Sequence, residues 1–336
     1  MRGRVHRDEH VITVECETAT EFLDLLDPRH GYFRPASMTL GAIFRGVKHD
    51  KYPLRPTAFR PHSRLLYRQR SVAAPLPTHV TQCAAEVQTL RSFFEIVARE
   101  GIRLAEDSPT LRSSLQWWDE ILAQDTLISL RSPEVWPPPN LWSLLAIAQH
   151  YGVPTRALDW TRSALVAAYF ASAGSTTRQC NIAVWAYTHY ADRLERAIRR
   201  FEWQPDPIHN LVIFSAPEAD NPNLMAQRGM FMLYRQTLYE TAQTFDVIDY
   251  DKLFVQDYAA VSAHATFYKI TVPARESSMI RAMLAATGVT AATLFPGLAG
   301  AAREFREEQR LADLKIRIPS NGASEELQAE LMRIAV

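Results

Sequence analysis

The stretch Leu145–Ala171, LAIAQHYGVPTRALDWTRSALVAAYFA, joins two apolar segments through a short polar one. The first segment has the composition of a buried helix, which Gly152 and Pro154 would end. Asp159 or Thr161 can cap a second helix, whose small apolar residues predict burial on most faces. The sequence therefore predicts two core helices that meet at a polar turn.

This polar turn holds seven side chains with polar groups that need partners: Gln149, His150, Thr155, Arg156, Asp159, Trp160 and Thr161. A buried hydroxyl, amide or charge without a partner costs about 2 kcal/mol or more, so the turn is expected to be a hydrogen-bonded network. One interpretation is structural, with Arg156 paired to Asp159 or to a helix-end carbonyl. The other is a binding site, because helix ends at a polar turn present N–H groups suited to an anion.

A second unusual feature is an arginine at the end of an apolar strand, in Phe44-Arg45-Gly46. Glycine permits close backbone approach, and the planar guanidinium of arginine suits phosphate or carboxylate. Arg45 can therefore bind a ligand or form a buried salt bridge, for which Asp159 is a natural partner. Gln227, which lies just before a predicted strand, could border the same pocket.

The rest of the chain predicts one α+β domain over residues 1–336. The spacing of apolar residues favours an amphipathic helix over 81–101, and late helices are expected over 274–288 and 301–310. Strand candidates are residues 11–14, 39–47, 181–189, 211–217, 229–235 and 267–273. We expect a central mixed or antiparallel sheet with helices packed around it, a helix-rich N-terminal half and a sheet-rich C-terminal half.

Composition excludes several classes of function. Lysine plus arginine equals aspartate plus glutamate at 37 each, so the whole-chain charge gives no reason for non-specific attraction to nucleic acid or membrane. Three separated cysteines and ten histidines show no metal-ligand spacing, so no metal is predicted. Neither a signal peptide nor a membrane span is recognisable, which predicts a cytoplasmic protein. The phosphate-loop, dinucleotide-fold, zincin and hydrolase-elbow motifs are also missing from the sequence.

Several stretches together resemble the FRG-domain family, which takes its name from the triplet at Phe44, Arg45 and Gly46. The stretches that carry the resemblance are Phe44–Gly46, Leu54–Arg60, Ala148–Arg156, Leu158–Thr161, Ala168–Ala171, Asn221–Phe231 and Thr293–Leu298. The similarity extends over about residues 20–302 and leaves a charged helix and tail over 303–336. It implies a bacterial or phage protein of the kind found in conflict and defence systems.

The triplet is also similar, more distantly, to the first strand of ADP-ribosyltransferases. That resemblance implies that Arg45 binds a phosphate of NAD, with Phe44 and Gly46 completing the first-strand signature. The residues themselves suggest that Thr155 and Gln227 border the same site. The clustering of Asp159 with His150 and Arg156 suggests Asp159 as the catalytic carboxylate, with His150 and Arg156 positioning the substrate. The other features of such enzymes are a Ser-Thr-Ser strand and a glutamate, for which the candidates are Ser175–Thr177, Glu240 and Glu276.

Three functions remain open from the sequence. The first is an NAD-consuming ADP-ribosyltransferase or NAD glycohydrolase that acts as a toxin or antiphage defence effector. The second is a non-catalytic module that binds a nucleotide, a nucleic acid or a protein through the same pocket. The third is an RNA-cleaving toxin with His150 as general acid or base and arginines as phosphate clamps. The ligand is expected to be a nucleotide or another small molecule, and the macromolecular acceptor and oligomeric state stay open.

Overall fold

The structure is a computed structural model of the 336-residue chain. It describes residues 4–8, 11–30, 42–60, 63, 65, 78–104, 106–123, 135–174, 179–188, 211–217, 221–237, 249–252 and 266–314. The candidates Ser175–Thr177 and Glu240 therefore lie outside the described residues.

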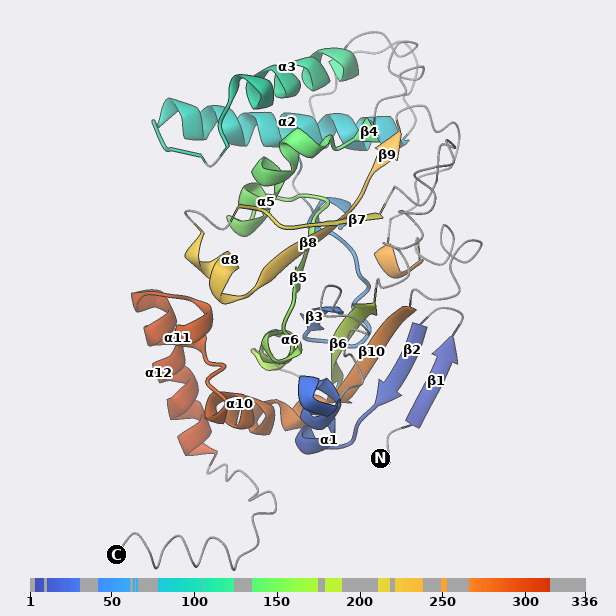
Figure 1. The fold of residues 1–336 in the computed structure, drawn as a ribbon, viewed down its shortest axis with the longest axis vertical. Coiled ribbons are helices and arrows are strands. Elements are labelled where there is room, and N and C mark those ends of the chain that lie inside the picture. Colours follow the sequence, from blue (N-terminus) through green and yellow to red (C-terminus); the bar gives the residue numbers. More distant parts are fainter. Residues whose placement is uncertain are drawn as a thin grey trace, which may run out of the picture.

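A mixed sheet of eight strands forms the centre of the protein, in the order β1-β2-β10-β6-β3-β5-β8-β7 (Figure 1). Its strands are β1 (Arg4–Asp8), β2 (Val11–Glu15), β3 (Ile43–Val47), β5 (Leu158–Thr161), β6 (Asn181–Thr188), β7 (Leu211–Phe214), β8 (Gly229–Tyr234) and β10 (Thr266–Pro273). Strands β2 and β10 run parallel, and the other neighbouring pairs are antiparallel. A small second sheet pairs β4 (Val135–Trp136) with β9 (Gln236–Thr237). The α+β class with a central mixed sheet is confirmed.

The helices lie on both sides of this sheet. They are α1 (Ala19–Leu26), α2 (Thr78–Arg99), α3 (Pro109–Ala123), α5 (Trp142–His150), α6 (Ala164–Ser172), α8 (Pro222–Ala226), α10 (Ser277–Ala286), α11 (Ala291–Leu294) and α12 (Leu298–Asp313). Short 3₁₀ turns occur at Pro28–His30, Thr57–Phe59, Pro139–Leu141 and Ala274–Glu276. Figure 1 shows α2, α3 and α5 together at one end of the protein, with α1, α10 and α12 at the other. No described helix is long and apolar enough to cross a membrane.

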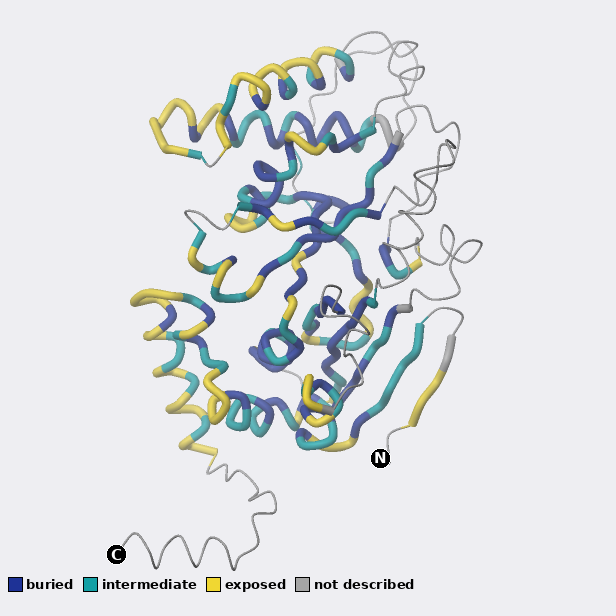
Figure 2. Tube along the Cα trace, in the orientation of Figure 1, coloured by how far each residue is buried: buried dark blue, intermediate teal, exposed yellow. Residues whose placement is uncertain are grey.

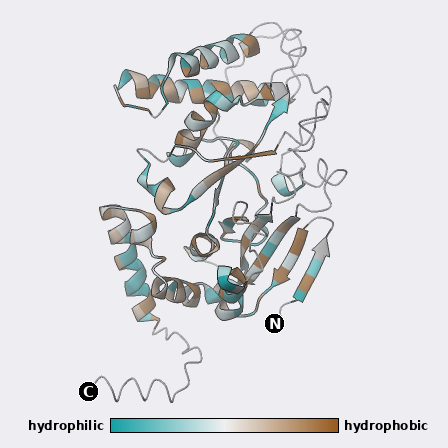
Figure 3. Ribbon diagram, in the orientation of Figure 1, coloured by the Kyte–Doolittle hydropathy of each residue, from teal (hydrophilic) through white to brown (hydrophobic). Residues whose placement is uncertain are grey.

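Helix α6 is buried over most of its surface, as its sequence predicted. Seven of its nine residues are buried, and Figure 2 shows it almost wholly buried while α12 has exposed stretches along its length. It begins at Ala164 because the Ser163 hydroxyl accepts a hydrogen bond from the backbone N–H of Val166. Its residues form one hydrophobic cluster with α1, α10 and alternate residues of β3, β6 and β10. Figure 3 shows the contrast in polarity, since hydrophilic residues occur over much of α12.

Strand β6 is covered on both faces, which explains its nearly continuous apolar sequence. Ile182, Val184 and Ala186 face the cluster around α6, whereas Ala183 and Trp185 face a second cluster on the opposite side of the sheet. A third cluster holds α2, α3 and α5 together and includes the first of the two predicted core helices. The sheet is therefore the middle layer of the protein.

The predicted strands and helices are largely present, and three details differ. Residues 158–161 form strand β5 rather than a helix cap, because they pair with β8, and it is Ser163 that caps α6. Strand β1 was not predicted from the sequence. Helix α12 begins at Leu298, so the expected boundary between residues 302 and 303 falls inside a helix. Strands β1 to β5 precede α6 in the chain, and β6 to β10 follow it.

Candidate functional site

A cavity of about 390 Å³ lies beside the junction of β3 and β5. These two strands pair only through Phe44 and Thr161, whereas β3 pairs with β6 over five residues. The cavity is lined by residues of five segments: Phe44, Arg45, Gly46 and Lys48; Gln149 and His150; Asp159, Trp160, Thr161 and Phe170; Leu224, Gln227, Gly229, Met230 and Phe231; and Phe295. It therefore collects most of the polar residues that the sequence had singled out.

The side chain of Arg45, on β3, reaches Asp159 on the neighbouring strand β5. Its Nη1 donates a hydrogen bond of 2.5 Å to the backbone carbonyl of Asp159 and lies 3.7 Å from the Asp159 carboxylate. The side chain of Arg45 is 17% exposed. Burial lowers the pKa of the guanidinium, Asp159 opposes this change, and the nearby Arg60 adds to it. A largely buried cation of this kind gains stability from any anion that enters the cavity.

Asp159 is held by a chain of hydrogen bonds that begins at two threonines. The hydroxyls of Thr155 and Thr57 donate to Oε1 of Gln149 at 2.8 and 3.2 Å. Because Oε1 accepts these two bonds, the amide nitrogen of Gln149 faces Asp159 and donates to its Oδ2 at 3.1 Å. The Asp159 side chain nevertheless stays 56% exposed. The carboxylate is thus oriented from two sides and still accessible from the cavity.

The other two residues of the Phe-Arg-Gly triplet serve the packing of α6. Phe44 is 6% exposed and belongs to the cluster around that helix. A Cβ atom on Gly46 would lie 2.0 Å from the backbone oxygen of Ala167 and 2.6 Å from the backbone nitrogen of Ala171. Only glycine lets α6 approach β3 so closely. The triplet therefore combines a packing function with a cation at the cavity.

The remaining predicted site residues have different positions. His150 is exposed at the end of α5, lines the cavity and contacts the Tyr151 ring edge to face at 5.1 Å. Gln227 also lines the cavity, and its amide donates to the carbonyl of Leu294 at 3.1 Å. Thr155 is fully buried and acts on the cavity only through Gln149.

Arg156 does not line the cavity, and its partner is not Asp159. Its side chain is 0% exposed and donates to the Glu86 carboxylate at 2.6 and 3.0 Å, and to the carbonyl of Tyr234 at 3.1 Å. Burial is the largest single effect and disfavours the charged guanidinium, but Glu86, Cys83 and Tyr250 together outweigh it, so the pKa of Arg156 lies above its ordinary value. The expected pairing with Asp159 is corrected, because Arg156 lies at a bend before β5 and is buried against Glu86, whereas Asp159 lies within β5 and lines the cavity. This position gives Arg156 a structural role between α2, β5 and β8.

Glu86 is the residue that sequence reasoning missed. It is 1% exposed, and its two oxygens accept from Arg156, from Trp136 Nε1 at 2.9 Å and from Gln82 at 2.9 Å. A signal was present, since Glu86 lies between Cys83 and Val87 on the apolar stripe of its helix. A charge on a buried stripe requires a buried partner.

The glutamate proposed as an alternative acid lies elsewhere. Glu276 accepts a hydrogen bond from the backbone N–H of Ala19 at 3.1 Å, at the start of α1, and does not line this cavity. Among the described residues no group of three His, Cys, Asp or Glu side chains could hold a metal ion.

The fold and site together define an α+β domain with a charged cavity at the junction of two central strands. Residues 41–180 match the family model of the FRG domain, so the chain contains an FRG domain over this range. The match includes Arg45, Gln149, His150 and Asp159, whereas Gln227 and Phe295 lie beyond it. No curated protein and no solved structure matches the chain.

Proposed function

We propose that this FRG-domain protein binds NAD in the cavity at β3 and β5 and consumes it as an ADP-ribosyltransferase or NAD glycohydrolase. The observation that supports this proposal is the Asp159 carboxylate, half exposed in the cavity wall and held between Arg45 and Gln149. The cavity volume of about 390 Å³ is within the range of small-ligand sites.

Arg45 binds the phosphate end of the substrate in this proposal. Its guanidinium has five N–H donors, and the hydrogen bond to the Asp159 carbonyl uses one of them. Lys48 lines the same cavity and adds a second positive charge. A pyrophosphate would thus offset the burial that lowers the pKa of Arg45.

Whereas Arg45 binds negatively charged phosphate in this proposal, Asp159 stabilises the positive charge that develops during the reaction. When the bond between the nicotinamide nitrogen and C1′ of its ribose breaks, the electron pair leaves with nicotinamide and positive charge develops on the ribose. The Asp159 carboxylate stabilises that charge electrostatically. Water or an acceptor group then bonds to C1′ and releases one proton, so NAD⁺ and water give ADP-ribose, nicotinamide and H⁺. His150 and Gln227 contact the substrate from the cavity walls.

The test is nicotinamide release from NAD by the purified protein, with and without cell extract as a source of acceptors. Asp159→Asn removes the charge and keeps the side-chain shape, so release should fall at least about a hundredfold. Asp107→Asn is the matched control, because its carboxylate pairs with Arg112 on the surface at 2.7 Å. Arg45→Gln should weaken NAD binding, measured by calorimetry, in a variant whose circular dichroism matches the parent.

Absence of nicotinamide release under these conditions refutes the enzymatic proposal. If NAD then still binds through Arg45, the protein is a nucleotide-binding module. If RNA is cleaved instead, and His150→Ala abolishes cleavage, the cavity is that of a ribonuclease. An enzyme that consumes NAD would deplete the cell of NAD. Expression of the parent protein should therefore arrest growth, and the Asp159→Asn variant should not. This result is expected of a toxin or antiphage defence effector.

A further inference from the structure

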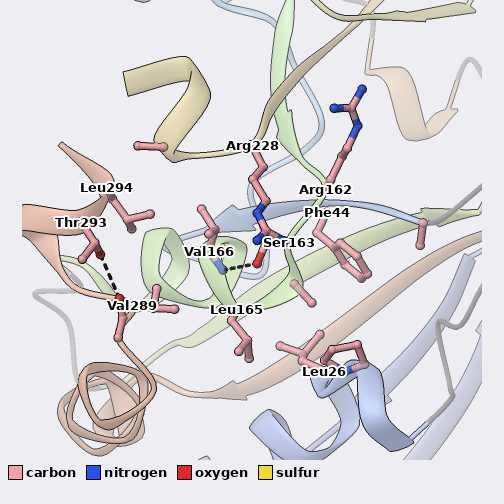
Figure 4. Close-up of a pocket in the computed structure, with 15 residues that line it drawn as sticks. Leu26, Phe44, Arg162, Ser163, Leu165, Val166, Arg228, Val289, Thr293 and Leu294 are labelled. Carbon is pink, nitrogen blue, oxygen red and sulfur yellow. Dashed lines mark hydrogen bonds between the residues drawn. The ribbon is translucent and has the colours of Figure 1, made fainter. Parts of the chain in front are cut away.

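A second cavity, of about 500 Å³, lies beside the first. It is lined by the end of α1, the start of α6, the turn between α8 and β8, and the segment from Gly288 to Leu294 (Figure 4). Phe44 lines both cavities, and the hydrogen bond from the Gln227 amide to the Leu294 carbonyl joins the wall of one to the wall of the other. Apart from Phe44, the residues that line this second cavity have no role in the function proposed above.

The charge of this second cavity has one sign. Its described lining includes Arg162 and Arg228 and no carboxylate. Figure 4 shows the Arg228 side chain directed toward Ser163, whereas Arg162 turns away and donates to the Ser215 hydroxyl at 3.2 Å. The backbone N–H of Arg162 donates to the Arg228 carbonyl at 3.0 Å, which fixes the two segments relative to each other. Arg228 is therefore the cation that a ligand in this cavity would meet.

The remaining walls are mostly aliphatic. Leu26, Leu165, Val166, Val289 and Leu294 surround the space, and Figure 4 shows several of these side chains around it. Aliphatic walls favour a flexible hydrocarbon body, whereas the described residues that line this cavity offer one aromatic ring, Phe44. A guanidinium beside them favours a carboxylate or phosphate at one end of that body.

We propose that this second cavity binds an amphipathic anion, an aliphatic chain that ends in a carboxylate or a phosphate monoester. The inference does not depend on NAD consumption, since it uses a separate cavity and a separate arginine. Both anion types share the chemistry that Arg228 recognises. The experiment below distinguishes them.

The probes are octanoate, decanoate, decyl phosphate, decanol and AMP, and binding to the full-length protein is measured by calorimetry and ligand-observed NMR. Each buried methylene contributes roughly a fourfold gain in affinity, so decanoate should bind about fifteenfold more tightly than octanoate. Decanol lacks the anion and should bind more weakly than decanoate. A preference between decanoate and decyl phosphate identifies the natural head group.

Two variants locate the binding, and two more serve as controls. Arg228 has φ 49°, a left-handed conformation that asparagine tolerates well, so Arg228→Asn removes the charge with little backbone cost. Arg228→Asn should lower the affinity for decanoate about tenfold or more. Arg99→Gln, on α2, should leave that affinity unchanged. Leu165→Trp fills the space and should abolish binding of all the alkyl probes. In Asp159→Asn, decanoate binding should be unchanged even if nicotinamide release is lost.

The proposal is overturned by any of three results. The first is no detectable binding of decanoate or decyl phosphate at millimolar concentration. The second is equal affinity in the parent and in Arg228→Asn, which would place the probe elsewhere. The third is binding of AMP that depends on Arg228, without binding of the alkyl anions, which would make the cavity a nucleotide site.

Discussion

The ion pair between Glu86 and Arg156 gives the sharpest stability prediction. In the native protein each carboxylate oxygen of Glu86 accepts two hydrogen bonds. Glu86→Gln replaces one of these oxygens by an amide NH₂ group, which cannot accept them. The Arg156 guanidinium, 0% exposed, then loses its countercharge in the core. Removal of one partner from a buried ion pair costs about 3 to 5 kcal/mol, so Glu86→Gln should lose that much free energy of unfolding in urea, followed by circular dichroism. Asp107→Asn breaks a surface pair and should lose less than about 1 kcal/mol.

A double-mutant cycle separates the pair from its surroundings. In the combination of Glu86→Leu with Arg156→Met neither charge is left unpaired, so the double variant should be more stable than the sum of the single losses by about 2 kcal/mol. If Arg156 is structural, the folded double variant should keep the activity of the parent in the nicotinamide assay.

Three outcomes would refute this reasoning. Strictly additive losses, or a Glu86→Gln variant as stable as the parent, would show that the two charges do not interact in a buried site. A double variant that is stable but inactive, next to an active parent, would show that Arg156 acts on the substrate. That last result would restore the role that the sequence suggested for this arginine.

Two further predictions concern packing and pH. Gly46→Ala should destabilise the protein by about 3 kcal/mol in urea, because its Cβ would meet the backbone of Ala167, whereas Gly288→Ala, with open space and φ 81°, should cost about 1 kcal/mol. Equal losses would contradict the close contact. Burial, with a smaller effect of Glu21, raises the pKa of Cys16 from 9.0 to about 12. Its contribution to stability is complete below pH 9 and is lost as pH rises toward 12, so Cys16→Ala should lose less stability than the parent between about pH 8 and about pH 10.5.

The sequence could predict elements whose signal is local. Apolar runs predicted strands β6 and β10, and the small apolar residues of α6 predicted its burial, because each pattern depends on the chain segment alone. The same patterns could not predict strand β5. The segment 158–161 is short and partly polar. It is extended because β8 and β3, which come from distant parts of the chain, pair with it.

The candidate site was predicted in part for the same reason. Arg45 and Asp159 are unusual in their local surroundings, so both were identified, and the structure places them 3.7 Å apart at their charged groups. The partner of Arg156 could not be chosen from sequence alone, because Glu86 lies 70 residues away, on α2. The tertiary structure decides the matter, since it buries Arg156, which precedes β5, against Glu86 and places Asp159, within β5, at the cavity.

The sequence by itself thus determined most of the longer helices, most strands, the α+β class and the residues that resemble the FRG family. Tertiary structure alone decided the strand order, the junction where β3 and β5 share a single residue pair, and the division of the polar turn into a core ion pair and a cavity wall. Local patterns depend on neighbours a few residues apart, whereas these features depend on which distant segments meet when the core closes.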